Sequence, residues 1–283
     1  MIYTTRFAPS PTGPLHLGHA FSALTAFDRA RAAHGRFLLR LEDIDQSRAR
    51  PEWTAQIFDD LQWLGLTWPS PVLHQSENMK SYAQAINKLW KNKLLYRCDC
   101  NRRDIAEAAG APQEGVPTHG PDGLIYPGTC RSRHPRGGPV PAAATLRLDM
   151  QSALNHATGT LTYTETGVAP GQIDVRDTHP SDTIGDIVLA RRDMATSYHL
   201  SVVVDDAAQS ITEVVRGEDL ADATRIHVIL QALLNVPTPA YHHHQLIQDE
   251  AGKRLAKRDD ARAIATYRSE GATPEVIRAM VGL

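Results

Sequence analysis

The first 45 residues alternate between strand and helix patterns, and this alternation limits the possible folds more than any other feature of the chain. Ile2–Phe7 is typical of a short buried strand, and Ala8–Pro14 carries three prolines and a glycine, which exclude both a helix and a strand ladder. Gly18–Ala33 has apolar residues at helical spacing, and Phe37–Leu41 forms the next apolar run. A strand, a helix and a second strand form a βαβ unit, so we predict an α/β fold with a parallel sheet.

The loop after the first strand and the acidic residues after the second are predicted to meet. In open parallel sheets, ligands bind at the carboxyl ends of the strands. There the Pro-Ser-Pro-Thr-Gly loop would lie beside Glu42, which directly follows Phe37–Leu41. The sequence therefore predicts a binding site at this edge of the sheet.

The rest of the chain continues the mixed pattern. Amphipathic helices are expected around Trp53–Leu64, Tyr82–Trp90 and Ile226–Leu234, and two shorter helices near 261–269 and 274–281. The run His242–His244 has no cysteine or carboxylate at ligand spacing, and we interpret it as a loop. We expect five further strands, which would complete the sheet: Ala144–Met150, Ile173–Val175, Asp186–Ala190, Tyr198–Val204 and Ile211–Val215.

The composition excludes several protein classes. No stretch of about 18 apolar residues could span a membrane, and the first residues lack the basic and apolar regions of a signal peptide, so we predict a cytoplasmic protein without a membrane partner. The 30 basic and 32 acidic side chains give a formal net charge of -2, so any polyanion must bind local patches. Three cysteines in a reducing compartment favour a metal site or free thiols over disulfides.

Two histidines stand three residues apart at the expected start of the first helix. His16 and His19 would lie on nearly one face, beside backbone N–H groups that attract an anion. Gly18 leaves room for a polyanion to approach the backbone, and either imidazole can donate a hydrogen bond to a phosphate oxygen. The segment predicts a phosphate site, and the alternative is a pair of solvated histidines.

A cationic run lies near the other end of the chain. Lys253–Arg258 holds four cations in six residues, directly after Gly252. Such a run is usually a solvated surface loop. The functional alternative is a loop whose cations neutralise a triphosphate.

These two segments together resemble a known enzyme family. Arg6–His19 and Lys253–Arg258 resemble the two signature motifs of class I aminoacyl-tRNA synthetases, and Arg6–Gly13 with Leu39–Asp45 resembles the glutamyl and glutaminyl branch. The resemblance covers essentially all 283 residues and implies a Rossmann-like catalytic core that binds ATP, with Mg²⁺, at the head of the first helix. It implies three catalytic residues that also contact ATP: His16, His19 and Lys257. It also implies two further contacts to ATP, Gly18 and Arg254.

The second motif departs from the family pattern at two positions. Lys257 matches its second lysine, whereas Arg254 stands where the first lysine is expected and Ala256 replaces the usual serine. We interpret Arg254 as a tolerated exchange of one cation for another, although arginine and lysine bind phosphate differently.

The charges of glutamate suggest what a pocket for it must contain. Two carboxylates and one ammonium need at least one guanidinium and one acidic partner. Arg6 and Arg216, each at the end of an expected strand, are suitable cations, and Glu42 suits the ammonium. The alternative for both arginines is a structural ion pair with Glu42 or Asp219. The resemblance supports this assignment and implies the rest of the glutamate site: Phe7, Ala8, Pro9, Ser10 and Tyr198.

All three cysteines lie in a segment rich in glycine and proline. Three thiolates can enclose one structural zinc ion if a fourth ligand joins them: Cys98, Cys100 and Cys130. His119 and His134 are the chemically favoured candidates for that ligand. In the glutamyl-queuosine branch of the family a tyrosine precedes the last cysteine by four residues, which implies Tyr126 as the ligand and His119 as the second candidate. Three thiols without a metal are the alternative.

Two basic stretches flank the cysteines. Arg97–Arg103 and Arg131–Arg136 carry several cations with little acidic relief in the sequence. We interpret them as candidate contacts to an RNA backbone, and a solvated surface is the alternative.

The length of the chain bears on its domain organisation. Related glutamyl-tRNA synthetases continue through a large helical anticodon-binding region, whereas this chain stops at Leu283, so we expect no anticodon-binding domain. We expect four parts: the first half of the catalytic core at 1–96, an insertion with the zinc module at 97–183, the second half of the core at 184–240, and the lysine loop with C-terminal helices at 241–283.

The short members of the family imply a specific reaction. Tyr198–Ala207 and Val215–Leu220 resemble their sequences, and these enzymes activate glutamate with ATP and attach it to the queuosine base at the wobble position of tRNA(Asp). The resemblance therefore implies a ligase, which we expect to be a monomer, with ATP, L-glutamate and queuosine-containing tRNA(Asp) as partners. Two alternatives stay open: a truncated glutamyl-tRNA synthetase that charges a tRNA 3′ end, and a non-catalytic RNA-binding paralogue.

Overall fold

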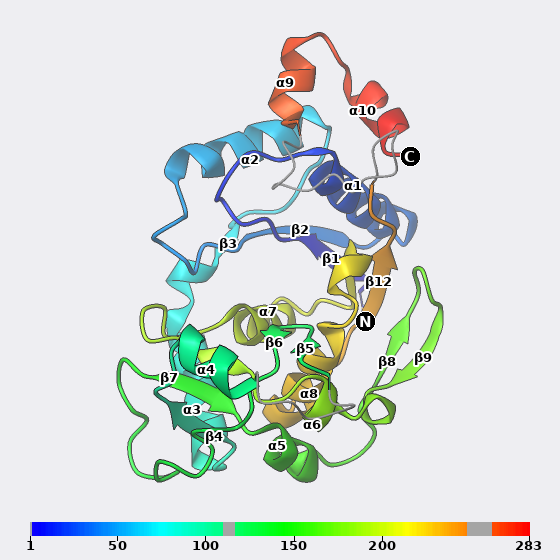
Figure 1. The fold of residues 1–283 in the computed structure, drawn as a ribbon. Helices are drawn as coiled ribbons and strands as arrows, with labels where there is room; N and C mark the ends of the chain where they lie inside the picture. Colours follow the sequence, from blue (N-terminus) through cyan, green and yellow to red (C-terminus); the bar gives the residue numbers. More distant parts are fainter. Residues whose placement is uncertain (1, 110–116, 248–261) are drawn as a thin grey trace.

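A computed structural model describes residues 2–109, 117–247 and 262–283 (Figure 1). The βαβ unit that the sequence predicts is present, as β1 (Thr4–Phe7), α1 (Leu17–Ala32) and β2 (Arg36–Leu41). β1 and β2 pair in parallel, and both consist almost entirely of buried residues. A parallel strand that is covered on both faces needs such a continuous buried run, which explains the apolar residues of β2 on either side of the buried Arg40.

The central sheet extends on both sides of this unit. β3 pairs with β2 in parallel, and on the other side of β1 four strands follow in the order β11-β12-β8-β9. The two groups meet where the backbone N–H of Thr212 donates to the carbonyl of Thr4 at 2.8 Å. β11, β12 and β8 are mutually parallel, and β9 is an antiparallel edge strand. The bounds are β3 (Leu73–His74), β8 (Thr162–Glu165), β9 (Gly171–Asp174), β11 (Glu213–Gly217) and β12 (Ala240–His244). The predicted α/β class with a parallel sheet is confirmed.

Helices lie on both sides of this sheet (Figure 1). One group comprises α1, α2 (Pro51–Trp63), α9 (Ile264–Ser269) and α10 (Pro274–Met280). The other comprises α3 (Met79–Lys91), α7 (Tyr198–Ala208) and α8 (Thr224–Leu234). Each group has its own buried apolar core, the first around Leu24 and Leu39, the second around Leu89, Leu200 and Ile229. The sheet thus separates two cores and leaves its carboxyl edge for a site.

Two of the predicted strands belong to another sheet. β7 (Thr145–Leu148) pairs antiparallel with β10 (Val188–Ala190) and with β4 (Leu95–Cys98). The prediction that these segments complete the central sheet was wrong. Their apolar pattern indicates strands but carries no information on partners, and their buried residues join the core around Leu89.

The segment Tyr198–Val204, predicted as a strand, lies in the helix α7, so that prediction was also wrong. The hydroxyl of Ser197 accepts from the backbone N–H of Leu200 and caps the helix. The consecutive valines of α7 favour a strand, but this intrinsic preference is weak. The cap at Ser197 and the burial of α7 on several faces override it.

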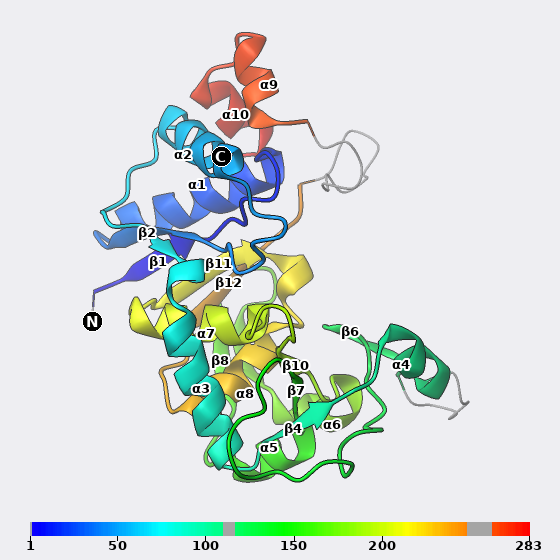
Figure 2. The same cartoon turned by 90° about the vertical axis from the view of Figure 1, so that its left-hand side faces the viewer.

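A small module projects from the body of the molecule between β4 and β7 (Figure 2). It holds α4 (Arg102–Ala109) and the hairpin β5 (His119–Gly120) with β6 (Gly123–Leu124). The strands β8 and β9 also fall within residues 97–183, interpreted above as an insertion, yet they belong to the central sheet. The remaining short helices are α5 (Met150–His156), α6 (Pro180–Thr183), η1 (Gln75–Glu77), η2 (Arg176–Thr178) and η3 (Glu218–Leu220). In the described part of the chain, no helix is long and apolar enough to cross a membrane.

Candidate active site and metal centre

A cavity of about 480 Å³ opens at the carboxyl ends of β1 and β11. Its lining includes nine of the residues predicted from the sequence: Arg6, Phe7, Ala8, His16, Gly18, His19, Glu42, Tyr198 and Arg216. Pro9 supports the site through its backbone, because its carbonyl accepts from the Glu42 N–H at 3.0 Å. Ser10 is exposed and is not among the lining residues. Arg254 and Lys257 lie outside the described residues.

The two histidines cap α1 at the mouth of this cavity. His16 Nδ1 accepts from the Gly18 N–H at 3.1 Å, and His19 Nδ1 accepts from the His16 N–H at 3.1 Å. Their ring centroids lie 3.8 Å apart. Because both Nδ1 atoms accept, we assign the proton of each neutral ring to Nε2, from which it can donate to an oxyanion. The pair sits at the positive end of the helix dipole, which favours a phosphate.

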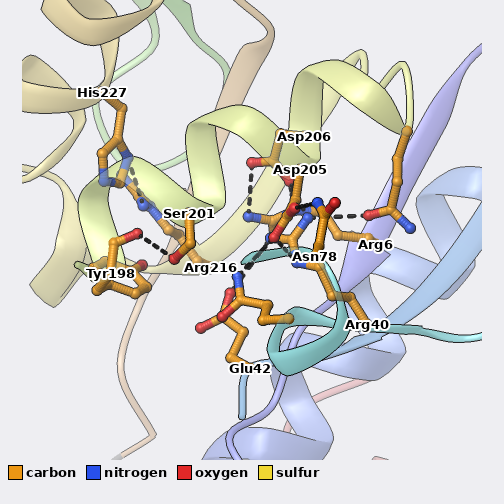
Figure 3. Close-up of polar contacts among 12 residues, drawn as sticks. Arg6, Arg40, Glu42, Asn78, Tyr198, Ser201, Asp205, Asp206, Arg216 and His227 are labelled. Atoms are coloured by element: carbon orange, nitrogen blue, oxygen red, sulfur yellow. Dashed lines mark hydrogen bonds and ion pairs between the residues drawn. The ribbon is translucent and has the colours of Figure 1, made fainter. Parts of the chain in front are cut away.

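Beside the cavity, two arginines share one buried carboxylate (Figure 3). Asp206 on α7 accepts from Arg6 Nε at 2.9 Å and from Arg40 NH1 at 2.7 Å. Burial opposes ionisation of this carboxyl, but the two guanidinium groups outweigh it and hold the pKa of Asp206 at about 2. The ion-pair partner of Arg6 is therefore Asp206. The sequence alternative for this partner was Glu42 or Asp219.

Glu42 faces the cavity just beyond β2. Its Oε1 lies 3.3 Å from Arg40 NH2. Burial raises the pKa of Glu42, although Arg40 and Arg6 oppose the shift. Burial also raises the pKa of Tyr198, which keeps the phenol neutral and able to donate. A carboxylate beside a neutral hydroxyl suits a ligand ammonium, whose positive charge would favour the ionised form of Glu42.

Arg216, on β11, has different surroundings from Arg6. Its Nε donates to His243 at 3.2 Å and its NH1 to His227 at 3.3 Å. Its NH2 donates to the Thr224 hydroxyl at 2.6 Å and to the Leu220 carbonyl at 3.1 Å. Within the described ranges no carboxylate, Asp219 included, forms an ion pair with Arg216. A buried cation whose hydrogen-bond partners in the described ranges are all neutral is well suited to an anionic ligand.

The three cysteines converge at the base of the projecting module. Their sulfur atoms all lie within 4.8 Å of one another: Cys98, Cys100 and Cys130. The Tyr126 hydroxyl lies 3.5 Å from Cys98 Sγ and 3.4 Å from Cys100 Sγ. Beside them, the Arg147 guanidinium lies 3.9 Å from the centroid of the Tyr126 ring. The cluster could hold a metal ion, with Tyr126 placed to complete the ligand set.

The two histidines considered as the fourth ligand contact other groups. His119 Nδ1 lies 3.0 Å from the Thr118 hydroxyl, and His134 Nε2 lies 2.6 Å from Asp99 Oδ2. Neither belongs to the cysteine cluster. Of the candidates named from the sequence, Tyr126 is the one that the fold brings to the sulfur atoms.

Residues 3–283 match the family described as "tRNA synthetases class I (E and Q), catalytic domain". The chain belongs to this family. It is 59% identical to a "Glutamyl-Q tRNA(Asp) synthetase" of Rhodobacter capsulatus over 281 residues, 99% of each chain. It is 41% identical to a protein of the same name from Nocardia farcinica, over 98% of this chain and 82% of that one. The predicted family and its enzymatic class, an aminoacyl-tRNA synthetase-like ligase, are confirmed.

Solved structures agree with this class I assignment. A glutamate tRNA ligase from Elizabethkingia meningosepticum, in complex with its amino acid, matches with a TM-score of 0.77 and 25% identity. The match covers 100% of this chain and 61% of that one. A methionyl-tRNA synthetase from Mycobacterium tuberculosis matches with a TM-score of 0.63 at 9% identity, which shows the shared fold.

Several residues in and beside the cavity are not indicated by the sequence pattern. The interpretation of His242–His244 as a loop was wrong, because these residues end β12, between β11 and β8. His243 is fully buried, and His244 Nε2 lies 2.7 Å from the Ser22 hydroxyl in the cavity wall. The three histidines hide this strand in the sequence pattern because they are polar, and the fold places one of them, His243, against the buried carboxylate of Glu165.

The basic stretches beside the cysteines are more balanced than the sequence suggests. Four of their arginines form ion pairs with acidic residues distributed over the module and its base: Arg97 with Asp99, Arg103 with Glu107, Arg131 with Asp186, and Arg136 with Asp149. Only one of these acidic partners, Asp99, lies within either basic stretch. The field that these stretches present to a polyanion is therefore weaker than their cation count implies.

Proposed function

We propose that the protein activates L-glutamate with ATP and transfers it to the queuosine base at the wobble position of tRNA(Asp). The observation that carries this proposal is the cavity at the carboxyl edge of the sheet. It brings together the guanidinium groups of Arg6 and Arg216, the carboxylate of Glu42, and a helix end capped by His16 and His19. Their charges complement the two carboxylates and the ammonium of glutamate and the phosphates of ATP. The similarity to proteins named glutamyl-Q tRNA(Asp) synthetase supports the choice of acceptor.

In the first step, the α-carboxylate of glutamate attacks the α-phosphorus of ATP, pyrophosphate leaves and glutamyl-adenylate forms. His16 and His19 donate from Nε2 to phosphate oxygens, at the helix end whose dipole favours negative charge. Arg254 and Lys257 are assigned to the phosphates by the family resemblance. Phosphate charge is further neutralised by the Mg²⁺ that accompanies ATP. The protein therefore acts by positioning and by charge.

In the second step, a hydroxyl group of the queuosine base attacks the acyl carbonyl, and AMP leaves. No side chain of the cavity is assigned as general base, and the phosphate of AMP can accept the proton. Glu42 and Tyr198 hold the ammonium during both steps, so that the carbonyl keeps its place.

We expect radioactive glutamate to enter tRNA(Asp) that contains queuosine, and not the matched tRNA(Asp) with guanine at the wobble position. The base supplies the only proposed nucleophile, so its removal abolishes the product. Nuclease digestion of the labelled tRNA, followed by identification of the labelled fragment, measures the position.

Two other results would redirect this assignment. Label on the 3′ adenosine would support a truncated glutamyl-tRNA synthetase instead. Absence of glutamate-dependent ATP–pyrophosphate exchange, with and without tRNA, would support a non-catalytic RNA-binding protein.

We also propose zinc as the ion held by the cysteine cluster, with Tyr126 as the fourth ligand. Thiolates with one oxygen or nitrogen donor in a tetrahedral set are typical of zinc, and an irregular module with little core gains stability from it. Replacing Cys130 by serine should remove most of the zinc and lower the melting temperature by at least about 4 °C, corresponding to roughly 2 kcal/mol.

Elemental analysis and thermal unfolding measure these two effects. His119→Ala and His134→Ala are the matched controls, and both should keep the metal content of the parent protein. A parent protein without bound zinc would refute the assignment.

A further inference from the structure

A line of hydrogen bonds runs from Arg216 away from the cavity through two buried imidazoles. Arg216 NH1 lies 3.3 Å from His227 Nδ1, His227 Nε2 lies 3.1 Å from His199 Nδ1, and His199 Nε2 lies 3.3 Å from Asp122 Oδ1. An arginine can only donate, so His227 Nδ1 accepts and the ring carries its proton on Nε2. That proton is donated to His199, whose own Nε2 proton is donated to Asp122. The tautomers of His227 and His199 therefore both follow from the fact that Arg216 can only donate.

A second, shorter line leaves the same guanidinium on its other side. Arg216 Nε donates to His243 Nε2 at 3.2 Å, so the His243 ring carries its proton on Nδ1. This Nδ1 hydrogen-bonds to the buried carboxylate of Glu165, which also accepts from the His243 backbone N–H at 3.1 Å. Arg216 is thus held between two neutral imidazoles. His243 is anchored directly to the carboxylate of Glu165, and His227 is anchored through His199 to that of Asp122.

The remaining contacts of Arg216 fix its orientation. NH2 donates to the Thr224 hydroxyl and to the Leu220 carbonyl, so the described groups use four of the five guanidinium N–H bonds. One hydrogen of NH1 is left for a ligand in the cavity that Arg216 lines.

The two arginines of the cavity are therefore balanced in opposite ways. Arg6 binds Asp206 through both Nε and NH2, at 2.9 and 3.2 Å, so its charge is compensated inside the protein. On the side of Arg216, one imidazole separates the guanidinium from the carboxylate of Glu165, and two separate it from that of Asp122. Burial lowers the pKa of His227 and His243, and the charge of Arg216 adds to this effect, so both rings stay neutral.

We propose that His227, His243 and Thr224 are positioning residues which aim Arg216 at the cavity through neutral acceptors, so that its whole charge is reserved for a carboxylate of the substrate. This inference rests on the proposed binding of glutamate in the cavity. A carboxylate in direct contact with Arg216 would give the same geometry but would act as a resident counter-ion. The imidazoles and the hydroxyl orient the guanidinium without competing with the ligand.

The test compares an amide with a carboxylate of the same shape beside Arg216. In His227→Asn the side-chain oxygen can take the place of Nδ1 and stay neutral, whereas in His227→Asp the same position carries a negative charge. Calorimetry measures the dissociation constant of L-glutamate. For His227→Asn we expect it to stay within about threefold of the wild-type value. For His227→Asp we expect it to rise by at least about 30-fold, the lower end of what loss of a buried charge pair costs.

A second pair makes the test independent of the first position. Thr224→Asn and Thr224→Asp place a neutral or a charged oxygen against NH2 at the first turn of α8, where an acidic residue also suits the helix. The carboxylate should again weaken glutamate binding more than the amide, while ATP binding stays within about threefold in all four variants.

The outcomes separate this inference from the function on which it rests. A wild-type protein that binds no L-glutamate would overturn the proposed function, and this inference with it. If the wild type binds glutamate, and the amide and carboxylate variants weaken glutamate binding equally at both positions, this inference alone would be overturned.

Discussion

Replacing Arg216 by methionine should lower kcat/KM for glutamate in adenylate formation by about 10³-fold. The guanidinium is buried, and the groups around it in the described structure are neutral, so the substrate carboxylate is expected to be its counter-ion. Loss of one partner of a buried charge pair costs about 4 kcal/mol, which is about three powers of ten. Methionine keeps the volume and removes the charge. Glutamate-dependent ATP–pyrophosphate exchange at varied glutamate concentration measures the effect.

Two variants make this result specific. Arg36→Met removes an exposed arginine at the amino end of β2, the opposite edge of the sheet from the cavity, and should leave the exchange rate within about twofold of the wild type. Arg216→Lys should recover part of the loss, because it restores the charge but cannot reach the same acceptors. Full activity of Arg216→Met in a protein with an unchanged melting temperature would remove Arg216 from the glutamate site.

The sequence predicts the parts of this fold that depend on local patterns. The βαβ unit follows from the succession of a strand pattern, a helix pattern and a second strand pattern within 45 residues. Arg6 and Glu42 then lie together because both are near the carboxyl ends of adjacent parallel strands. Strand pairing is not local. The leucines of β7 predict a strand but not its partner, which depends on the packing of Leu146 and Leu148 in the second core.

The site shows the same division. Residues that we propose to bind glutamate by charge, such as Arg6, Glu42 and Arg216, stand out in the sequence because they are charged groups at the ends of expected strands. The groups that hold them do not stand out. Asp206 was hidden because a valine-rich run made α7 resemble a strand, and His243 was hidden because three histidines resemble a loop. Their role depends on burial and on partners more than 20 residues away, which a local pattern cannot encode.

Replacing Asp206 by asparagine should lower the free energy of unfolding by about 3 kcal/mol at pH 7. The change leaves Arg6 and Arg40, both buried, without the carboxylate that they share at 2.9 and 2.7 Å. The effect should also depend on pH. The pKa of Asp206 is lowered from 3.8 to about 2 in the folded protein, so its ionisation contributes about 2 kcal/mol of stability above pH 4. This contribution is lost as the pH falls towards 2.

Urea unfolding of both proteins between pH 7 and pH 3 measures this contribution. The difference in free energy between wild type and Asp206→Asn should be constant from pH 7 to pH 5, and roughly half of the pH-dependent part should be lost at pH 3. Asp59→Asn is the matched control, because Asp59 pairs with Arg268 at 2.6 Å on the exposed surface, where an ion pair contributes less than about 1 kcal/mol. If Asp206→Asn changed the stability no more than Asp59→Asn at any pH, the shared carboxylate would not hold the two arginines, and the position of Arg6 in the cavity would need another explanation.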